Sequence, residues 1–187
     1  TDEMTGILLN ECRKTFPGVP LFLYRHSLGG GRVVDYLVRK NPQVRGAIVT
    51  SPWLKLSFEP ERTKVRMAGF MKNILPSLVQ SSGLVVDHLS RDEDVVDRYR
   101  KDPLVHGLIS VSLFHSAMAS ASAALKNASS LKKPLLLMHG TGDQICSSDG
   151  SRAFADSTPM AELRLWDGAY HELHNDLCRH EVFDTIR

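Results

Sequence analysis

The sequence predicts an α/β protein in which helices flank a mostly parallel sheet and one helical insertion interrupts the pattern. Two observations support this fold class: short apolar runs of β type alternate with helical patterns, and glycine-marked loops carrying reactive side chains follow several of those runs. The chain has 187 residues, of which 42% are hydrophobic, so it can form one substantial core. We expect two stretches of core, 1–53 and 132–187, separated by the insertion 54–131.

The first core stretch opens with a polar helical pattern over 5–14, and an apolar run at 21–24 then predicts a strand. Glycines follow that run, and the pattern is helical over 32–40 until the pair 41–42, Asn-Pro, ends it. A second apolar run at 46–50 predicts a buried strand. Strand, tight turn, helix and strand in succession are what a parallel α/β sheet requires.

The insertion begins near residue 54, where the chain becomes more polar and helical in pattern until about 131. Its place in the sequence puts it over the carboxyl edge of the sheet. Strand character returns at 134–138 and again at 161–166, and a glycine-containing loop follows each of these runs. The second core stretch therefore adds two more strands and two loops at the same edge.

Three residues just beyond the ends of predicted strands have the types that nucleophilic catalysis requires: Ser27, Asp143 and His171. A serine hydroxyl is a poor nucleophile at neutral pH, so an imidazole must take its proton and a carboxylate must hold that imidazole in the right tautomer. In a strand-turn-helix elbow, the backbone N–H of the next residue, Leu28, faces the same space as the hydroxyl. The pattern predicts a Ser-His-Asp triad with Leu28 as an oxyanion donor.

Neighbouring residues allow alternatives. His174 is a second candidate for the base, although His171 comes first after its strand. Cys146 is either a thiol beside the site or a buried, inert cysteine. His171, His174 and Cys178 could be gathered by a helix, but their spacing matches no zinc pattern, so we expect no metal.

Four segments together resemble the monoacylglycerol lipase and lysophospholipase branch of the α/β-hydrolases. They are the elbow around Ser27, Asp-Pro-Leu-Val at 102–105, the loop at 139–146 and Gly-Ala-Tyr-His-Glu at 168–172. The resemblance covers nearly the whole chain. It implies Ser27 as nucleophile, Asp143 as acid, His171 as base and the Leu28 N–H as one oxyanion donor. It also implies hydrolysis of a lipid-like carboxylic ester, such as a monoacylglycerol or a lysophospholipid, without a cofactor.

Two departures from that family are visible. Arg25 stands where the elbow usually has glycine, so its side chain should crowd the turn or point outward toward the mouth of the site. The resemblance implies further strands before the nucleophile strand, with a turn that gives the second oxyanion donor, and we expect these to be missing from this chain. We therefore expect the strand at 21–24 to be an unpaired edge that pairs with another chain supplying the missing strands.

The insertion corresponds to the family's cap and contains two apolar stripes at helical spacing. One includes Met67, Phe70, Met71 and Ile74, and the other includes Val111, Phe114, Met118, Ala121 and Leu125. Either stripe would line an acyl-chain tunnel or pack the cap onto the core, and packing is the commoner use. Basic residues flank the first stripe, which also allows peripheral contact with a membrane.

Composition excludes other classes of protein. A formal charge of +2 without a basic run gives no reason to expect nucleic-acid binding. Three scattered cysteines make a disulfide framework improbable and favour a reducing compartment, so we expect a cytoplasmic protein with some membrane association.

Two interpretations of function remain from the sequence. The first is a serine esterase or lipase acting on lipid-like esters. The second is an inactive fragment or pseudoenzyme that binds lipid or a partner chain; Arg25 and the missing strands favour it, and the intact triad residues oppose it.

Overall fold

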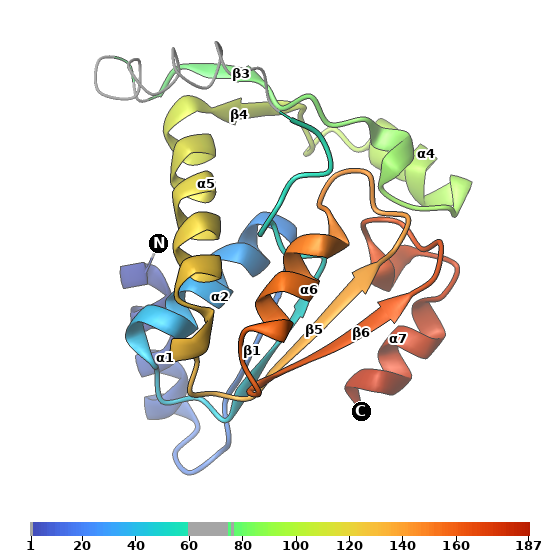
Figure 1. Ribbon diagram of the computed structural model, residues 1–187. Coiled ribbons are helices and arrows are strands. Elements are labelled where there is room, and N and C mark those ends of the chain that lie inside the picture. The colour runs from blue at the N-terminus through green and yellow to red at the C-terminus, as the bar shows by residue number, and fades with distance from the viewer. Residues whose placement is uncertain (1, 60–74, 76) are drawn as a thin grey trace.

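The computed structural model, which describes residues 2–59, 75 and 77–187, is built around a parallel sheet of four strands (Figure 1). Its order is β1 (Phe22–His26), β2 (Gly46–Thr50), β5 (Leu135–Gly140) and β6 (Ala161–Trp166), and each neighbouring pair runs parallel. The predicted α/β class with a mostly parallel sheet is confirmed. Parallel pairing brings the carboxyl ends of all four strands to one edge.

Helices cover the two faces of this sheet. Alternation along β5 decides which side chains go where, because Leu135 and Leu137 face one layer while Leu136 and Met138 face the other. The first layer contains α2 (Ser27–Lys40), α6 (Ser148–Asp156) and the end of α5 (Val111–Lys126), and α1 (Asp2–Thr15) packs beside α2. The second layer is formed by the short helix η3 (Leu173–Asn175) and by α7 (Arg179–Ile186).

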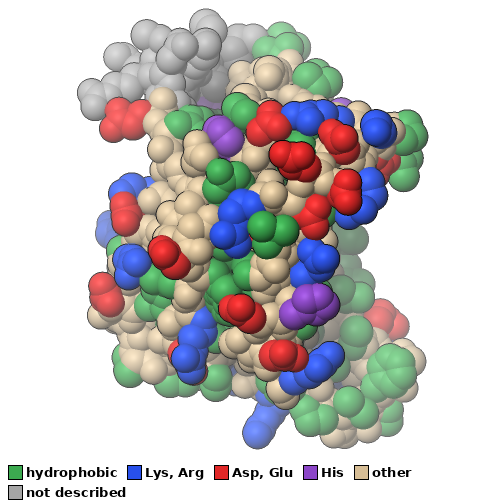
Figure 2. All heavy atoms as spheres, turned by 90° about the vertical axis from the view of Figure 1, so that its right-hand side faces the viewer, with side chains coloured by type: hydrophobic (Ala, Val, Ile, Leu, Met, Phe, Trp, Pro, Cys, Tyr) green, Lys and Arg blue, Asp and Glu red, His purple; other side chains and the backbone are tan. Residues whose placement is uncertain are grey.

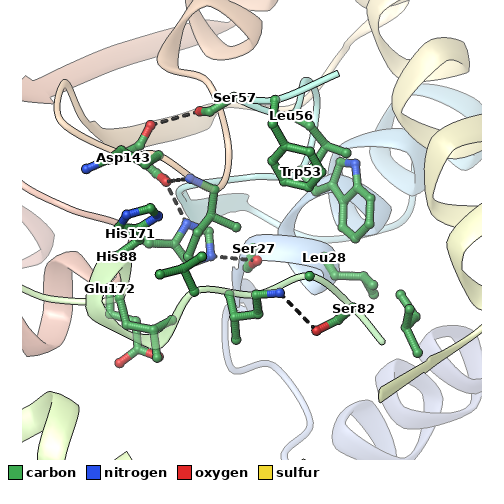
Figure 3. Close-up of a pocket in the computed structure, with 18 of the residues that line it drawn as sticks. Ser27, Leu28, Trp53, Leu56, Ser57, Ser82, His88, Asp143, His171 and Glu172 are labelled. Atoms are coloured by element: carbon green, nitrogen blue, oxygen red, sulfur yellow. Dashed lines mark hydrogen bonds and ion pairs between the residues drawn. The ribbon is translucent and has the colours of Figure 1, made fainter. Parts of the chain in front are cut away.

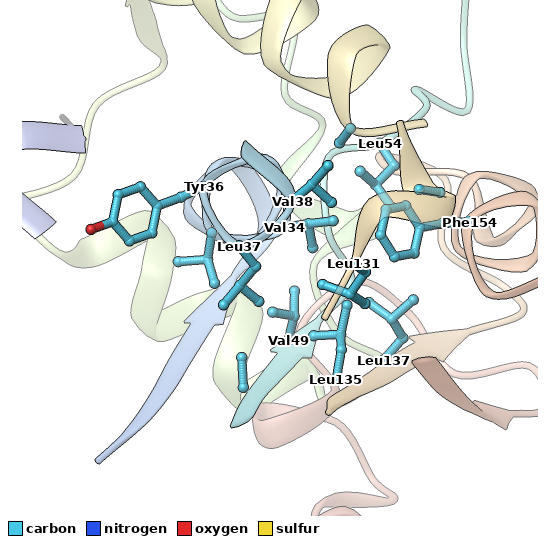
Figure 4. Close-up of a cluster of buried hydrophobic side chains, with 14 of the residues drawn as sticks. Val34, Tyr36, Leu37, Val38, Val49, Leu54, Leu131, Leu135, Leu137 and Phe154 are labelled. Carbon is cyan, nitrogen blue, oxygen red and sulfur yellow. The ribbon is translucent and has the colours of Figure 1, made fainter. Parts of the chain in front are cut away.

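The larger core cluster lies between the sheet and the first layer (Figure 4). Its fully enclosed side chains come from both core stretches of the sequence and from the end of the insertion, and they include Val34, Leu37, Val49, Leu137 and Phe154. Ala124, at the end of α5, is also fully buried there. The insertion is therefore anchored in the main core by its last helix.

The cap differs from the helical insertion that the sequence predicts. Its described part contains a two-stranded antiparallel sheet, β3 (Val79–Ser81) with β4 (Leu108–Ser110), besides η1 (Val86–His88), α4 (Glu93–Lys101) and η2 (Ala128–Ser130). Strands of three residues are too short to leave a periodic signal. Over the cap, acidic and basic side chains are interspersed (Figure 2), and none of the described helices has the length and hydropathy to cross a bilayer.

In the described part of the chain, β1 is one of the two edge strands of the four-stranded sheet. Phe22 is 61% exposed and Tyr24 is 46% exposed, both on the face that α7 covers further along the sheet. Leu23 points to the opposite face and packs against the larger core cluster. One face of the edge strand is thus covered and the other is open to solvent.

Candidate active site

The elbow between β1 and α2 presents Ser27 in a strained backbone conformation. Ser27 is the first residue of α2 and has a φ of 53°, which lies in a backbone region that residues other than glycine rarely adopt. The helix begins five residues before the predicted start at 32, and it includes Gly30 and Gly31, which the sequence prediction left outside the helix. A Cβ on Gly30 would lie 2.6 Å from Val49 Cγ1, and one on Gly31 would lie 2.4 Å from the Trp53 carbonyl oxygen.

The structure brings Ser27, His171 and Asp143 into one hydrogen-bonded chain (Figure 3). The Ser27 hydroxyl donates to His171 Nε2 across 2.8 Å, and His171 Nδ1 donates to Asp143 Oδ2 across 2.7 Å. His171 is 3% exposed and Asp143 is 7% exposed. This geometry allows the imidazole to take the serine proton while the carboxylate fixes the opposite ring nitrogen.

Asp143 accepts further hydrogen bonds from its own loop and from β5. Its Oδ1 accepts the N–H groups of Ile145 and Cys146 at 2.8 and 2.9 Å, and its Oδ2 also accepts Nε2 of His139 at 3.1 Å. Burial by itself would raise the pKa of Asp143, but the hydrogen bonds from His139 and His171 outweigh burial and hold that pKa far below its ordinary value. The carboxylate is therefore ionised at neutral pH.

The loop that carries His171 is fixed from two sides. The Ser51 hydroxyl, at the end of β2, donates to the His171 carbonyl oxygen across 2.6 Å, and Asp176 Oδ2 accepts the N–H of Tyr170 at 3.0 Å. His174, the alternative base, instead packs its ring edge-on against His26, with centroids 4.9 Å apart. The hydrogen-bond geometry thus favours His171 over His174.

His26 is partly buried and precedes Ser27 in the elbow. Its Nδ1 donates to the Thr50 carbonyl oxygen across 3.1 Å, and its ring centroid lies 4.7 Å from that of His171. Burial, followed by the nearby imidazoles of His171 and His174, lowers the pKa of His26 well below its ordinary value. The neutral ring of His26 therefore lies next to His171.

A cavity of about 760 Å³ opens above Ser27, between the sheet edge and the cap. Leu28 and Trp53 line it, Phe114 packs against Trp53 with ring centroids 5.7 Å apart, and Glu172, His88 and Tyr99 provide polar groups. Its remaining wall is mainly apolar and includes Leu56, Phe58, Leu84, Val85, Leu89, Leu108 and Ile109. Such a cavity has the size and lining of a small-molecule site.

The structure describes the second of the two predicted apolar stripes but not the first. Met67, Phe70, Met71 and Ile74 lie outside the described residues, so their acyl-chain and membrane interpretations stay predictions. In the second stripe Phe114 lines the cavity, whereas Val111 and Ala121 are buried and pack the cap.

Two further expectations concern side chains next to the elbow. Arg25 is exposed, its aliphatic carbons run along Gly29, and it is not among the described residues that line the cavity. Cys146 is fully buried, and burial together with the Asp143 carboxylate raises the pKa of its thiol well above the ordinary value, against the effect of a hydrogen bond with Ser27. This favours the inert interpretation of Cys146. Among the described residues, no cluster of three His, Cys, Asp or Glu side chains is arranged to hold a metal ion.

Comparison with known proteins gives concordant matches. Residues 4–178 match the family described as serine aminopeptidase, S33. The chain is 32% identical over 174 residues to the monoglyceride lipase of Rattus norvegicus, covering 90% of this chain and 57% of that protein. It is 30% identical to phospholipase YtpA of Bacillus subtilis, covering 90% of this chain and 67% of that protein.

Among solved structures, the monoacylglycerol lipase of Paleococcus ferrophilus superposes with a TM-score of 0.90 at 33% identity. The match covers all of this chain and 73% of that one. The chain thus spans a little over half the length of the rat lipase and nearly three quarters of the Paleococcus structure.

Proposed function

Because the chain belongs to the serine aminopeptidase S33 family, in the monoacylglycerol lipase and lysophospholipase branch of the α/β-hydrolases, we propose that it hydrolyses carboxylic esters through a triad of Ser27, His171 and Asp143. The observation that supports this most directly is the pair of hydrogen bonds, 2.8 and 2.7 Å long, that connects the three side chains. Fold alone would not suffice, because one fold hosts many activities.

In the proposed reaction, Ser27 Oγ attacks the ester carbonyl carbon while its proton passes to His171 Nε2. The tetrahedral oxyanion accepts a hydrogen bond from the Leu28 N–H. As the bond to the alcohol breaks, Nε2 returns the proton to the leaving oxygen and the acyl group stays on Ser27. A water molecule that gives its proton to Nε2 then attacks the acyl-enzyme, and the carboxylic acid departs as Ser27 recovers its proton.

The proposed substrate is a lipid ester such as a monoacylglycerol. The mainly apolar wall of the cavity suits an acyl chain, and Glu172, His88 and Tyr99 suit a polar head group. Two of the similar proteins are named as a monoglyceride lipase and a phospholipase, so an acylglycerol and a lysophospholipid are the substrates to compare.

A second candidate function is binding of lipid or of a partner chain without catalysis. It is favoured by the open edge of β1, where Phe22 and Tyr24 are exposed in the described part of the chain. Under this proposal a partner pairs with the open edge of β1 or a lipid occupies the cavity, and Ser27, His171 and Asp143 perform no reaction.

The deciding experiment is intact mass spectrometry of the folded protein after exposure to a fluorophosphonate, with Ser27→Ala as the control. A single adduct, formed as Ser27 Oγ displaces fluoride and absent from the variant, is the expected result. No adduct on a folded wild-type protein would refute the catalytic proposal for this chain and support the binding function. Release of fatty acid from monoacylglycerol and from lysophospholipid, measured side by side, then distinguishes the substrates.

A further inference from the structure

We propose that the cap segment 89–92 positions the loop of His171, with Asp176 as its buried anchor, so that the placement of the cap controls the alignment of the triad. The inference rests on the proposed function, because it assigns a positioning role within the same site. It concerns residues that the sequence patterns did not single out.

The first support is a set of hydrogen bonds between the cap and the loop 170–176. The Glu172 N–H donates to the Leu89 carbonyl oxygen across 2.8 Å, directly after His171 in the chain. The Ser90 hydroxyl donates to the Asn175 carbonyl oxygen across 3.1 Å. These two contacts hold the loop along its length, from the residue after the base to the end of the turn.

The second support is the environment of Asp176, whose side chain is fully buried. Its Oδ1 accepts Nε and Nη2 of Arg91 at 2.8 and 2.7 Å and the N–H of Leu177 at 2.6 Å, and its Oδ2 accepts the N–H groups of Tyr170 and Arg91 at 3.0 and 3.3 Å. One carboxylate therefore connects the cap to the residues on both sides of His171.

The charge state of Asp176 suits this role. Burial opposes its ionisation, but hydrogen bonds from the Arg91 side chain and from the backbone outweigh burial and lower the pKa of Asp176 below its ordinary value. A buried carboxylate with all its bonds satisfied has one low-energy position. The Tyr170 N–H, and with it the base, is held to that position.

The third support is that the same segment reaches the substrate cavity. His88 and Leu89 line the cavity, and Ser90 and Arg91, next in the chain, bond to the base loop. Movement of the cavity wall is therefore transmitted over one or two residues to the loop that carries His171.

The other end of the described cap holds the acid loop in a similar way. Leu56 forms an antiparallel bridge with Cys146, and the Ser57 hydroxyl donates to the Asp143 carbonyl oxygen across 2.8 Å. The Ser147 N–H donates to the Lys55 carbonyl oxygen across 2.8 Å. The cap thus contacts the acid loop through one segment and the base loop through another.

The test compares Arg91→Lys and Asp176→Asn with a matched control, Asp97→Asn. Asp97 lies on α4 of the same cap, where its carboxylate pairs with exposed Arg100. Asp97→Asn removes one negative charge, as Asp176→Asn does, but from a carboxylate that pairs with Arg100 on the same helix. Three quantities are measured on the intact chain: the rate of fluorophosphonate labelling at Ser27, kcat and KM for a soluble p-nitrophenyl ester, and backbone hydrogen exchange in 168–178 and in β5.

We expect Arg91→Lys to keep the charge but lose the paired contact, and to slow labelling and kcat by about tenfold, because small misplacements of catalytic groups have effects of this size or larger. KM should stay within about twofold, since the cavity wall itself is unchanged. Exchange should rise in 168–178 and stay at the wild-type level in β5. Asp176→Asn should give larger effects of the same kind, and Asp97→Asn should behave as wild type.

If Arg91→Lys were labelled at the wild-type rate and showed wild-type hydrogen exchange in 168–178, the inference would be overturned, even if Asp176→Asn did not fold. So would an equal rise of exchange in β5 and the loop, because that indicates general loss of stability rather than positioning. If the wild-type chain itself is not labelled at Ser27, the proposed function fails, and the exchange measurements still decide whether the cap holds the loop.

Discussion

The carboxylate of Asp143 is shared by two imidazoles, and this sharing fixes the protonation pattern around it. His139 Nε2 faces two acceptors, Asp143 Oδ2 and the Cys146 carbonyl oxygen, so this nitrogen carries the proton. Its Nδ1 lies 2.8 Å from the Ser151 hydroxyl on α6. His139 therefore connects Asp143 to helix α6, and in the proposed triad it is a positioning residue rather than a catalytic one.

Replacing His139 by Leu should lower the labelling rate of Ser27 about tenfold or more, because Asp143 loses one of the donors that hold its orientation. His139→Gln retains an N–H donor and should lose less. Urea unfolding serves as the second measurement, since the Ser151 hydroxyl left without a partner should cost about 1–3 kcal/mol in the Leu variant. A Gln variant as impaired as the Leu variant would contradict this role.

The lowered pKa of His26 predicts that the stability of the fold depends on pH. Its folded-state pKa lies well below the ordinary value of about 6.5, so on acidification the unfolded chain takes up a proton that the folded chain refuses. The free energy of unfolding should therefore fall as pH drops below about 6.5. His171, His174 and Asp143 face this ring, and the carboxylate only partly offsets the effect of burial and of the two imidazoles.

The measurement is urea unfolding of wild type and His26→Gln from pH 8 to pH 5. The stability difference between them should shrink as pH falls, because the variant lacks the group that resists protonation. Exposed His180→Gln, which leaves His26 in place, is the control and should still lose stability as pH falls. Asp143 and Asp176, whose pKa values are lowered, lose their contributions only below about pH 4 and so do not interfere.

The residues that sequence reasoning found and those it missed differ in one respect. Ser27, Asp143 and His171 stand in glycine-marked loops after apolar runs, where local pattern is informative. His139 is hidden inside a strand and Asp176 in an ordinary polar turn, and both act through partners on other segments. No local pattern reports such contacts.

At the scale of elements, the elbow shows tertiary contacts overriding local propensity. Glycines are unfavourable in helices, so the sequence predicts a helix from 32, yet α2 begins at Ser27. The close approach of Gly31 to the Trp53 backbone explains why a glycine is needed there. The strands β1, β2 and β5 were predictable from apolar runs and β6 from its alternation of apolar and charged residues, whereas β3 and β4 have three residues each.

Alanine at Gly31 should destabilise the fold by about 1–3 kcal/mol, because its Cβ would require the Trp53 backbone to move. Gly29→Ala is the matched control in the same helix: its Cβ would lie 3.5 Å from the flexible Arg25 side chain, and helix propensity should stabilise it by up to about 1 kcal/mol. Urea unfolding of both variants measures the contrast. Equal stabilities would refute the close-packing explanation.

At the scale of the whole molecule, the parallel sheet and its two helical layers follow from the alternation of strand and helix patterns. The position of the cap does not follow, because it depends on bonds between segments such as 89–92 and 170–176 that are distant in sequence. The sequence also predicts the open edge at β1, and Phe22 and Tyr24 are exposed there.

That edge should make the isolated chain associate with itself at high concentration, since unpaired strands with exposed apolar side chains pair readily. Phe22→Lys should reduce this association, measured by light scattering during size-exclusion chromatography over a range of concentrations. Leu104→Lys, at an 88% exposed loop position, adds the same charge away from the sheet. If both variants reduce association equally, net charge rather than the edge is responsible.

The positive φ of Ser27 affects how this sequence can evolve. A serine in that region of backbone space is strained by about 1–3 kcal/mol, whereas glycine adopts it without strain. In a library of variants selected only for thermal stability, glycine should therefore accumulate at position 27. Each variant with that substitution would lack the serine hydroxyl. Selection for turnover would oppose that drift, so the two regimes should diverge first at this codon.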